Sequence, residues 1–252
     1  MPSITLIAPA YNEGNTIVMN VKSLLSLQYP SYELIVVNDG SKDESLEKLI
    51  QKFSLEKIDE KEKRSTIPYA VVRGIYRSTL DKYSNLTVID KENGGRSDAL
   101  NCGISNAKTK LVLCTDADCI IEQDALLKMV RPYLEEQEKE VIACGGGIGI
   151  ANDSIFKNGT LQKLLLPKKM VSRIQVVEYI RAFLLGRMAW SHIDGLLLVS
   201  GAFGLYPKHR IEEVGGFDTK TVGEDLELCV RLRVHMEKLK IPYDLVYIPE
   251  TL

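Results

Sequence analysis

The chain has 252 residues, enough to bury a substantial core, and its 45% hydrophobic and 26% charged residues are typical of a soluble globular protein. A net charge of −2 argues against a broad nucleic-acid-binding surface, so no nucleic-acid partner is expected. The five cysteines form no C-x-x-C pair and three of them lie in apolar runs, which indicates reduced, buried thiols and a cytoplasmic protein.

The N-terminus begins a strand almost at once, without the basic segment that opens a signal peptide. The longest uncharged runs, such as residues 195–207, are too short to span a bilayer. We therefore expect this stretch of sequence to be soluble by itself.

Apolar runs and helical patterns alternate in the first half of the chain. The runs predict strands over 4–8, 34–37, 86–89 and 111–114, and the helical patterns cover 15–27, 43–53 and 97–107. This alternation predicts an α/β fold with a doubly wound, mostly parallel sheet. A polar cluster follows each strand, at the sheet edge where such folds bind ligands.

The remaining segments give mixed signals. The charged stretch 54–66 predicts a solvated excursion, and 69–79 predicts an added strand or hairpin without a clear position. Residues 124–136 predict a helix, 141–144 a strand, and the glycines at 145–147 a sharp turn. A long helix over 174–190 is most simply a core helix, although arginines flank its apolar stripe as in helices on a membrane surface.

Two carboxylates, Asp116 and Asp118, follow the strand at 111–114 one residue apart. In an extended segment such positions point to the same side, so both can converge on one ligand. Two clustered anions repel each other unless a cation or a hydroxyl-rich ligand lies between them, and a divalent metal that holds a phosphate suits this geometry. An ordinary exposed turn after a strand explains the pair equally well, because so short a motif often matches by chance.

Glycines 94 and 95 precede a predicted helix and are flanked by Lys91 and Arg96. Backbone amides at a helix N-terminus, together with two cations, can bind phosphate oxygens. Loop cations are as often simply solvated, so the pattern alone leaves this interpretation open.

The segments A-P-A-Y-N-E, V-N-D-G-S, K-E-N-G-G-R-S-D-A-L-N and T-D-A-D occur in this order, followed by further motifs at 199–206, 214–218 and 222–225. Together they resemble the family 2 glycosyltransferases of the GT-A fold over nearly the whole chain. The resemblance is greatest to membrane-embedded synthases of poly-N-acetylglucosamine, hyaluronan, chitin or cellulose. It implies a single GT-A domain over 1–252, with a nucleotide-sugar-binding half at 1–119 and an acceptor-binding half at 120–252.

The resemblance also implies a role for each matching residue. For the donor nucleotide, Pro9, Tyr11 and Glu13 would line the nucleoside pocket, and Asp39 would accept a hydrogen bond from N3–H of uracil. Lys91 and Arg96 would bind donor phosphates, Asp116 would contact ribose or metal, and Asp118 would ligate Mg²⁺ or Mn²⁺. Asp225, beside Glu224, would be the general base. The reaction would invert the anomeric centre without a covalent intermediate.

Each role has a structural alternative. Pro9 to Tyr11 can simply end a strand, Asp39 suits an Asp-Gly turn, and acidic residues at 224 and 225 favour any helix N-terminus. From its place at a strand end, we expect Asp39→Ala to weaken UDP binding and to spare the fold.

One family motif, Q-x-x-R-W, is expected shortly after residue 252, where the sequence ends. We therefore interpret the chain as the catalytic part of a longer membrane protein, at the cytosolic face of the membrane. Its expected partners are a UDP-sugar donor and a glycan acceptor, with membrane contact through segments outside this sequence.

Three other functions compete with this interpretation. The chain could transfer a single sugar to a lipid-phosphate carrier, or bind nucleotide sugars without catalysis. A sugar-phosphate nucleotidyltransferase shares the α/β layout, but it should carry a glycine-rich, arginine-containing loop after the first strand, and residues 8–14 lack one.

Overall fold

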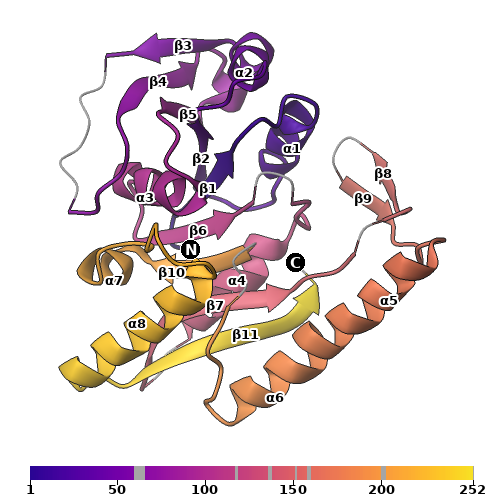
Figure 1. Cartoon of the computed structure of the whole chain (residues 1–252), viewed down its shortest axis with the longest axis vertical. Helices are drawn as coiled ribbons and strands as arrows, with labels where there is room; N and C mark the ends of the chain where they lie inside the picture. Colours follow the sequence, from indigo (N-terminus) through magenta and orange to yellow (C-terminus); the bar gives the residue numbers. More distant parts are fainter. Residues whose placement is uncertain are drawn as a thin grey trace.

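A nine-stranded sheet forms the centre of the computed structural model, which describes residues 1–59, 66–116, 119–135, 138–150, 152–157, 160–199 and 203–251. The strand order is β11-β7-β10-β6-β1-β2-β5-β4-β3 (Figure 1). The strands are β1 (Ile4–Ala10), β2 (Tyr32–Asp39), β3 (Leu55–Ile58), β4 (Val72–Ser78), β5 (Leu86–Lys91), β6 (Leu111–Thr115), β7 (Glu140–Gly147), β10 (Phe203–Pro207) and β11 (Tyr243–Thr251).

The four predicted strands form the parallel centre of this sheet, in the order β6-β1-β2-β5. Strands β4 and β10 run opposite to the others, so the expected mostly parallel sheet is confirmed. The central strands are apolar on both faces because helices cover both sides, as in other α/β folds. Their carboxyl ends all meet at one edge of the sheet.

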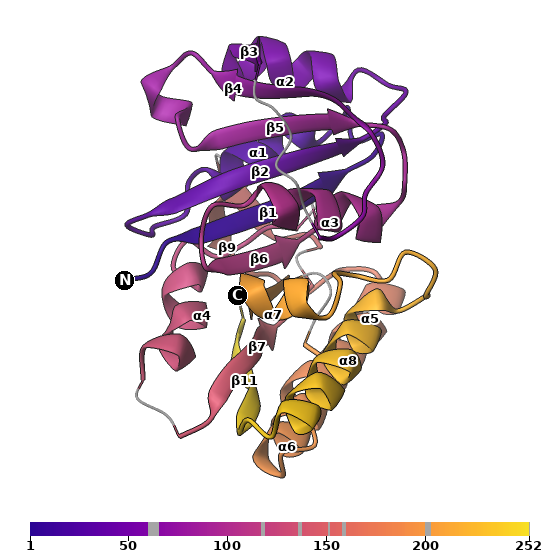
Figure 2. The same ribbon diagram turned by 90° about the vertical axis from the view of Figure 1, so that its left-hand side faces the viewer.

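Helices α1 (Ile17–Leu24), α2 (Ser45–Phe53) and α4 (Ala125–Leu134) pack on one face of the sheet. Helices α3 (Arg96–Asn106), α7 (Lys208–Glu213) and α8 (Glu224–Leu239) pack on the other (Figure 2). The apolar positions of α8 at 228, 232 and 236 are buried, as their helical spacing predicts. The single sheet joins both halves of the chain.

Two predictions about this sheet were wrong. Residues 55–58, within the charged stretch, form β3 and pair antiparallel with β4, while 60–65 lie outside the described residues. The glycines at 145–147 form the end of β7 and not a turn. A Cβ on Gly147 would lie 3.0 Å from the carbonyl oxygen of Glu250 in β11, so glycine permits this close strand approach.

The predicted long helix is one continuous helical run that consists of α5 (Met170–Tyr179), a π-helical segment (Ile180–Gly186) and α6 (Arg187–His192). A hairpin of β8 (Ile155–Lys157) and β9 (Thr160–Lys163) precedes it. It is not a core helix, because none of its residues is buried. Its exposed apolar residues are Met170, Val171, Ile174, Val177, Ile180, Leu184, Leu185, Met188 and Trp190. Within the described residues, no helix has the length and apolarity that crossing a bilayer requires.

Candidate functional site

The polar residues predicted from the sequence gather at the carboxyl edge of β1, β2, β5 and β6. The loop after β1 carries Tyr11, which is 46% exposed and therefore accessible to the face of a planar base. Glu13 accepts a hydrogen bond from Thr16 Oγ1 at 3.0 Å, at the start of α1. Pro9 lies within β1 and is half-buried.

The loop after β1 is fixed to the loop after β2. The Asn12 amide donates to Ser41 Oγ at 3.0 Å, and Asn12 Oδ1 accepts from the Lys42 amide at 2.8 Å. The Gly14 amide donates to Asp43 Oδ2 at 2.8 Å. These bonds hold the backbone around Tyr11 beside the carboxyl end of β2.

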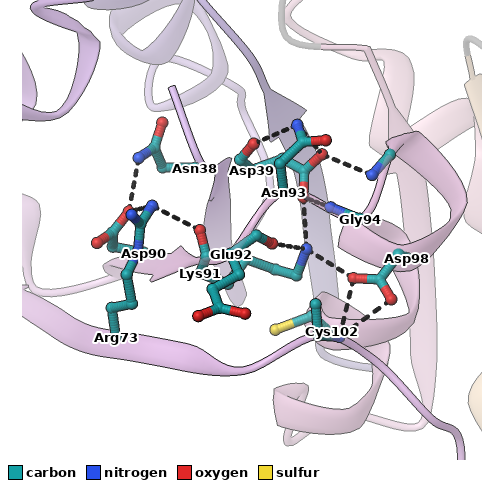
Figure 3. A network of polar contacts seen from close by, with 12 residues as sticks. Asn38, Asp39, Arg73, Asp90, Lys91, Glu92, Asn93, Gly94, Asp98 and Cys102 are labelled. Atoms are coloured by element: carbon teal, nitrogen blue, oxygen red, sulfur yellow. Dashed lines mark hydrogen bonds and ion pairs between the residues drawn. The ribbon is translucent and has the colours of Figure 1, made fainter. Parts of the chain in front are cut away.

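Asp39, the last residue of β2, is 3% exposed, and its carboxylate receives four donors (Figure 3). Oδ1 accepts from the Gly94 amide at 3.0 Å and from Lys91, and Oδ2 accepts from the Gly95 amide at 2.8 Å and Asn93 Nδ2 at 3.1 Å. A carboxylate has about four lone-pair positions, so these donors occupy them all. The uracil contact stays a prediction, and it would require one of these donors to move.

Lys91, the last residue of β5, is fully buried and does not lie on the loop surface. Its ammonium group binds Asp39, Asp98 Oδ1 at 2.6 Å and the Glu92 carbonyl at 2.7 Å (Figure 3). These three partners use all three N–H groups of a lysine. The expected phosphate site therefore differs in this structure, because Lys91 and the two glycine amides bind protein oxygens instead.

Asp98 is a site residue that the sequence analysis did not single out, although it lies within the motif quoted for residues 91–101. Both of its carboxylate oxygens accept from the Ala70 amide, at 3.1 and 3.0 Å, and one binds Lys91. A Cβ on Gly94 would lie 2.5 Å from its carboxyl carbon, which explains the glycine. Asp98 thus fixes the loop between β5 and α3 to the segment before β4.

Asn38 was also missed, although it lies in the second motif. Its side chain is buried on the opposite face of β2 from Asp39, and Nδ2 donates to Asp90 Oδ1 at 2.7 Å. Arg73 donates to the same oxygen at 3.0 Å. The Asn38 Oδ1 atom is buried and has no hydrogen-bond partner among the described residues.

Arg96, the first residue of α3, connects the two halves of the chain. Its Nε donates to Asp116 Oδ1 at 2.7 Å, just beyond β6, and its Nη1 donates to Glu224 at the start of α8. Burial alone would lower the pKa of Arg96, but the charges of Asp116 and Glu224 outweigh it, and the pKa is raised. The guanidinium is therefore a permanent cation between two carboxylates from distant segments.

Asp225 follows Glu224 in the first turn of α8 and is half-buried. Its Oδ1 accepts from the Leu226 amide at 2.8 Å. The helix enters through Gly223, whose φ of 87° is strained for other residues. The structure thus places Asp225 next to Glu224 and its contact with Arg96, at the same sheet edge as Asp39 and Asp116.

The predicted metal ligand Asp118 lies outside the described residues. Among those that are described, no three His, Cys, Asp or Glu side chains group as a metal site. The oxygen donors of Asp116 at the end of β6 are of the kind that Mg²⁺ and Mn²⁺ prefer. Asp116 and Asp118 together therefore suit a divalent cation chemically.

Residues 2–243 match the protein family described as "Glycosyltransferase like family 2". Among curated proteins, the chain is 29% identical over 260 residues to a poly-β-1,6-N-acetyl-D-glucosamine synthase of Staphylococcus aureus (strain MSSA476). This alignment covers 100% of the chain and 52% of that synthase. The chain is 27% identical over 255 residues to the synthase of the same name from Staphylococcus epidermidis, covering 99% and 51%. The chain thus spans about half the length of these relatives.

Two solved structures have the same fold. A mannosyltransferase from Pyrobaculum calidifontis, in complex with GDP-Man and Mn²⁺, superposes with a TM-score of 0.64 at 18% identity, covering 99% of the chain and 55% of that protein. Residues 1–349 of S. aureus TarS, in complex with UDP-GlcNAc, give a TM-score of 0.56 at 16% identity, covering 99% and 59%. Identities this low establish the fold alone, and the expected GT-A architecture is confirmed.

Proposed function

The chain belongs to glycosyltransferase family 2, and from this membership we propose that it transfers a sugar from a UDP-sugar to a growing glycan. The named relatives, synthases of a β-1,6-linked N-acetylglucosamine polymer, support this choice of donor and acceptor. In this proposal residues 1–119 bind the nucleotide sugar and residues 120–252 position the acceptor.

The observation that carries the proposal is the position of Arg96. It binds the carboxylate that follows β6 and the glutamate next to Asp225, so the donor-side strand ends and the proposed base face one reaction centre. If Glu224 and Asp225 only stabilised the start of α8, that helix would not have to begin beside β6, the strand that Asp116 and Asp118 follow.

The proposed reaction uses these residues in the following roles. The Asp225 carboxylate takes the proton of an acceptor hydroxyl while that oxygen forms a bond to the anomeric carbon. The bond from this carbon to the diphosphate oxygen breaks, and UDP leaves with the electron pair, so the anomeric centre is inverted. Tyr11, with Pro9 and Glu13, covers the nucleoside, and Arg96 adds positive charge beside the diphosphate.

A divalent cation is part of the proposal, with Asp118 and Asp116 as its ligands. When bound, Mg²⁺ or Mn²⁺ would neutralise charge on the departing diphosphate. The mannosyltransferase with the same fold was solved with Mn²⁺, which supports a divalent metal without deciding between the two ions.

The test of this proposal is sugar transfer by the purified full-length protein. We expect transfer from UDP-GlcNAc to a short β-1,6-linked N-acetylglucosamine acceptor, with binding of UDP that is tighter than that of GDP or ADP. Transfer from GDP-Man but not from UDP-GlcNAc would instead favour the donor found in the mannosyltransferase. UDP binding without transfer from any donor would favour a silent binding domain, and a single transfer to a lipid phosphate would favour the carrier-lipid reaction.

We further propose that the protein works at the cytosolic face of a membrane. The exposed apolar residues of α5 to α6 support this location, together with the basic residues Lys168, Lys169 and Arg173 at the start of this run. Co-sedimentation with vesicles that contain anionic lipid is the direct measurement. Ile174→Glu and Val177→Glu should then reduce the bound fraction without lowering the free energy of unfolding.

A further inference from the structure

A second group of polar side chains lies between α6, β11 and α8, at the same edge of the sheet. Arg187 is the first residue of α6, which packs against β11. Tyr247 in β11 pairs with Gly145 near the carboxyl end of β7. Strands β7 and β6 are both antiparallel to β10, so this end of β7 lies at the edge that holds Asp116.

Arg187 and Tyr247 each have a buried polar atom without a partner. The Nη1 of Arg187 and the hydroxyl of Tyr247 are covered from solvent and form no hydrogen bond among the described residues. The Arg187 guanidinium carbon lies 4.1 Å from the ring centroid of Phe183, a cation–π contact. Buried donors that lack partners are rare in native proteins, because they have lost their water without replacement.

Arg187 lies within electrostatic range of both Tyr247 and Asp225. Burial lowers the pKa of Arg187, and Tyr247 and Asp225 act against that change. Burial raises the pKa of Tyr247, and Arg187 acts against it. Despite this proximity, Arg187 and Asp225 form no direct ion pair in the described part of the chain. Asp225 therefore does not satisfy the unpaired Nη1 of Arg187, and a polar group from a ligand would.

The chemistry of the three side chains limits what that group can be. Arg187 only donates hydrogen bonds, Tyr247 donates and accepts, and the Asp225 carboxylate only accepts. An anionic ligand would meet the Asp225 carboxylate, and Arg96, the neighbouring cation, is already paired with Asp116 and Glu224. A neutral saccharide instead offers neighbouring hydroxyl and carbonyl oxygens, some of which accept while others donate.

We propose that Arg187 and Tyr247 form an acceptor-sugar subsite, in which they donate hydrogen bonds to oxygens of the sugar whose reacting hydroxyl faces Asp225. This inference rests on the proposed function and adds two residues that orient the acceptor. Both donor atoms are covered in this structure, so the sugar would have to displace the side chains over them when it binds.

The test measures binding of a β-1,6-linked N-acetylglucosamine tetrasaccharide to the full chain by calorimetry, with UDP binding measured in parallel. We expect Arg187→Met to weaken tetrasaccharide binding by about 10- to 100-fold and Tyr247→Phe by about tenfold, with UDP binding unchanged. The matched controls are Arg181→Met, which removes an exposed arginine from the same helical run, and Tyr243→Phe, which removes a β11 hydroxyl that donates to Glu237. Both controls should bind the tetrasaccharide as the wild type does.

Thermal unfolding separates this role from a structural one. The Tyr247 hydroxyl has no hydrogen-bond partner within the described residues, so Tyr247→Phe should leave Tm unchanged or raise it, whereas a lower Tm would overturn the assignment. The subsite assignment would also be overturned if both variants bound the tetrasaccharide as tightly as the wild type, or if the wild type did not bind it. In either case, UDP binding by the same samples would still support the proposed donor. Absence of UDP binding would remove the proposed function, and Arg187-dependent tetrasaccharide binding would then still support the subsite.

Discussion

Arg96 and Glu224 lie 128 positions apart in the chain, and the side chain of one binds that of the other at the carboxyl edge of the sheet. Arg96 also binds Asp116, so one guanidinium holds carboxylates from both halves of the chain. The start of α8, which carries Asp225, is thereby fixed beside the end of β6.

Removing Arg96 should therefore destabilise the protein through Glu224. Arg96→Met leaves two carboxylates without their cation, and we expect a loss of about 1–2 kcal/mol, because the guanidinium is partly exposed and its ion pairs are screened. The loss should be smaller when Glu224→Gln is present as well. Urea unfolding of the two single variants and the double variant measures this coupling. Strictly additive losses would show that the two side chains act independently.

Lys91 should be far more important for stability than a surface lysine. Its ammonium lies between the carboxylates of Asp39 and Asp98, and Lys91→Met leaves both buried without their cation, at a cost of about 3–5 kcal/mol. The matched control is Lys57→Met, which removes an exposed lysine from β3 and should change the free energy of unfolding by at most about 0.5 kcal/mol. Equal effects of the two substitutions in urea unfolding would contradict the buried role.

The affinity for UDP should depend on a divalent cation. We expect Mn²⁺ or Mg²⁺ to increase UDP affinity, and Asp118→Asn to remove this dependence, because the amide keeps the shape and loses the charge. Asp116→Asn should give a milder defect, and its Tm must be measured too, because it also weakens the contact with Arg96. Calorimetry with and without EDTA is the measurement. UDP affinity that EDTA does not change would exclude a metal bridge.

Glu140 should make stability depend on pH in the acidic range. Hydrogen bonds from Arg210, at 2.9 and 2.6 Å, lower the pKa of Glu140 below its ordinary value. A lowered folded-state pKa stabilises the protein above the unfolded-state pKa of about 4.3, and this contribution is lost as the pH falls through the folded-state value.

We therefore expect Glu140→Gln to be less stable than the wild type at pH 7, with the difference shrinking below about pH 4. Urea unfolding at several pH values measures it. The exposed Glu47→Gln in α2 is the control and should show little difference at any pH. A Glu140→Gln deficit that is constant across pH would contradict the assigned cause.

The sequence predicted the elements whose patterns are local. The strands at 4–8, 34–37, 86–89 and 111–114 are each present in a slightly longer form, because apolar runs mark buried strands directly. It did not predict β3 or the strand role of the glycines at 145–147, since both depend on partners from elsewhere in the chain. The apolar stripe over 174–190 predicts a core helix, whereas the helical run over 170–192 is exposed, because an apolar stripe does not reveal what covers it.

The motifs also located the site better than they described its contacts. Asp39, Arg96, Asp116 and Asp225, which belong to these motifs, lie at one edge of the sheet, as expected. The motifs gave no sign that Asp39 is enclosed by four donors. Its burial contradicts the premise that a strand-end polar side chain contributes little packing, on which the expectation for Asp39→Ala rests. Arg187 and Tyr247 lie outside the donor motifs, and the packing of α6 on β11 brings their two elements together.

The most direct test of the proposed mechanism is the rate of sugar transfer from UDP-GlcNAc by the full-length wild type and full-length Asp225→Asn, with UDP and metal binding measured on the same samples. A positioned base typically supplies about 10²–10⁴-fold in rate, so the account predicts a loss of this size with unchanged UDP affinity, and a smaller loss in Glu224→Gln. Asparagine also suits a helix N-terminus, so a purely structural Asp225 would lose little. Turnover near the wild-type rate in Asp225→Asn would contradict the account.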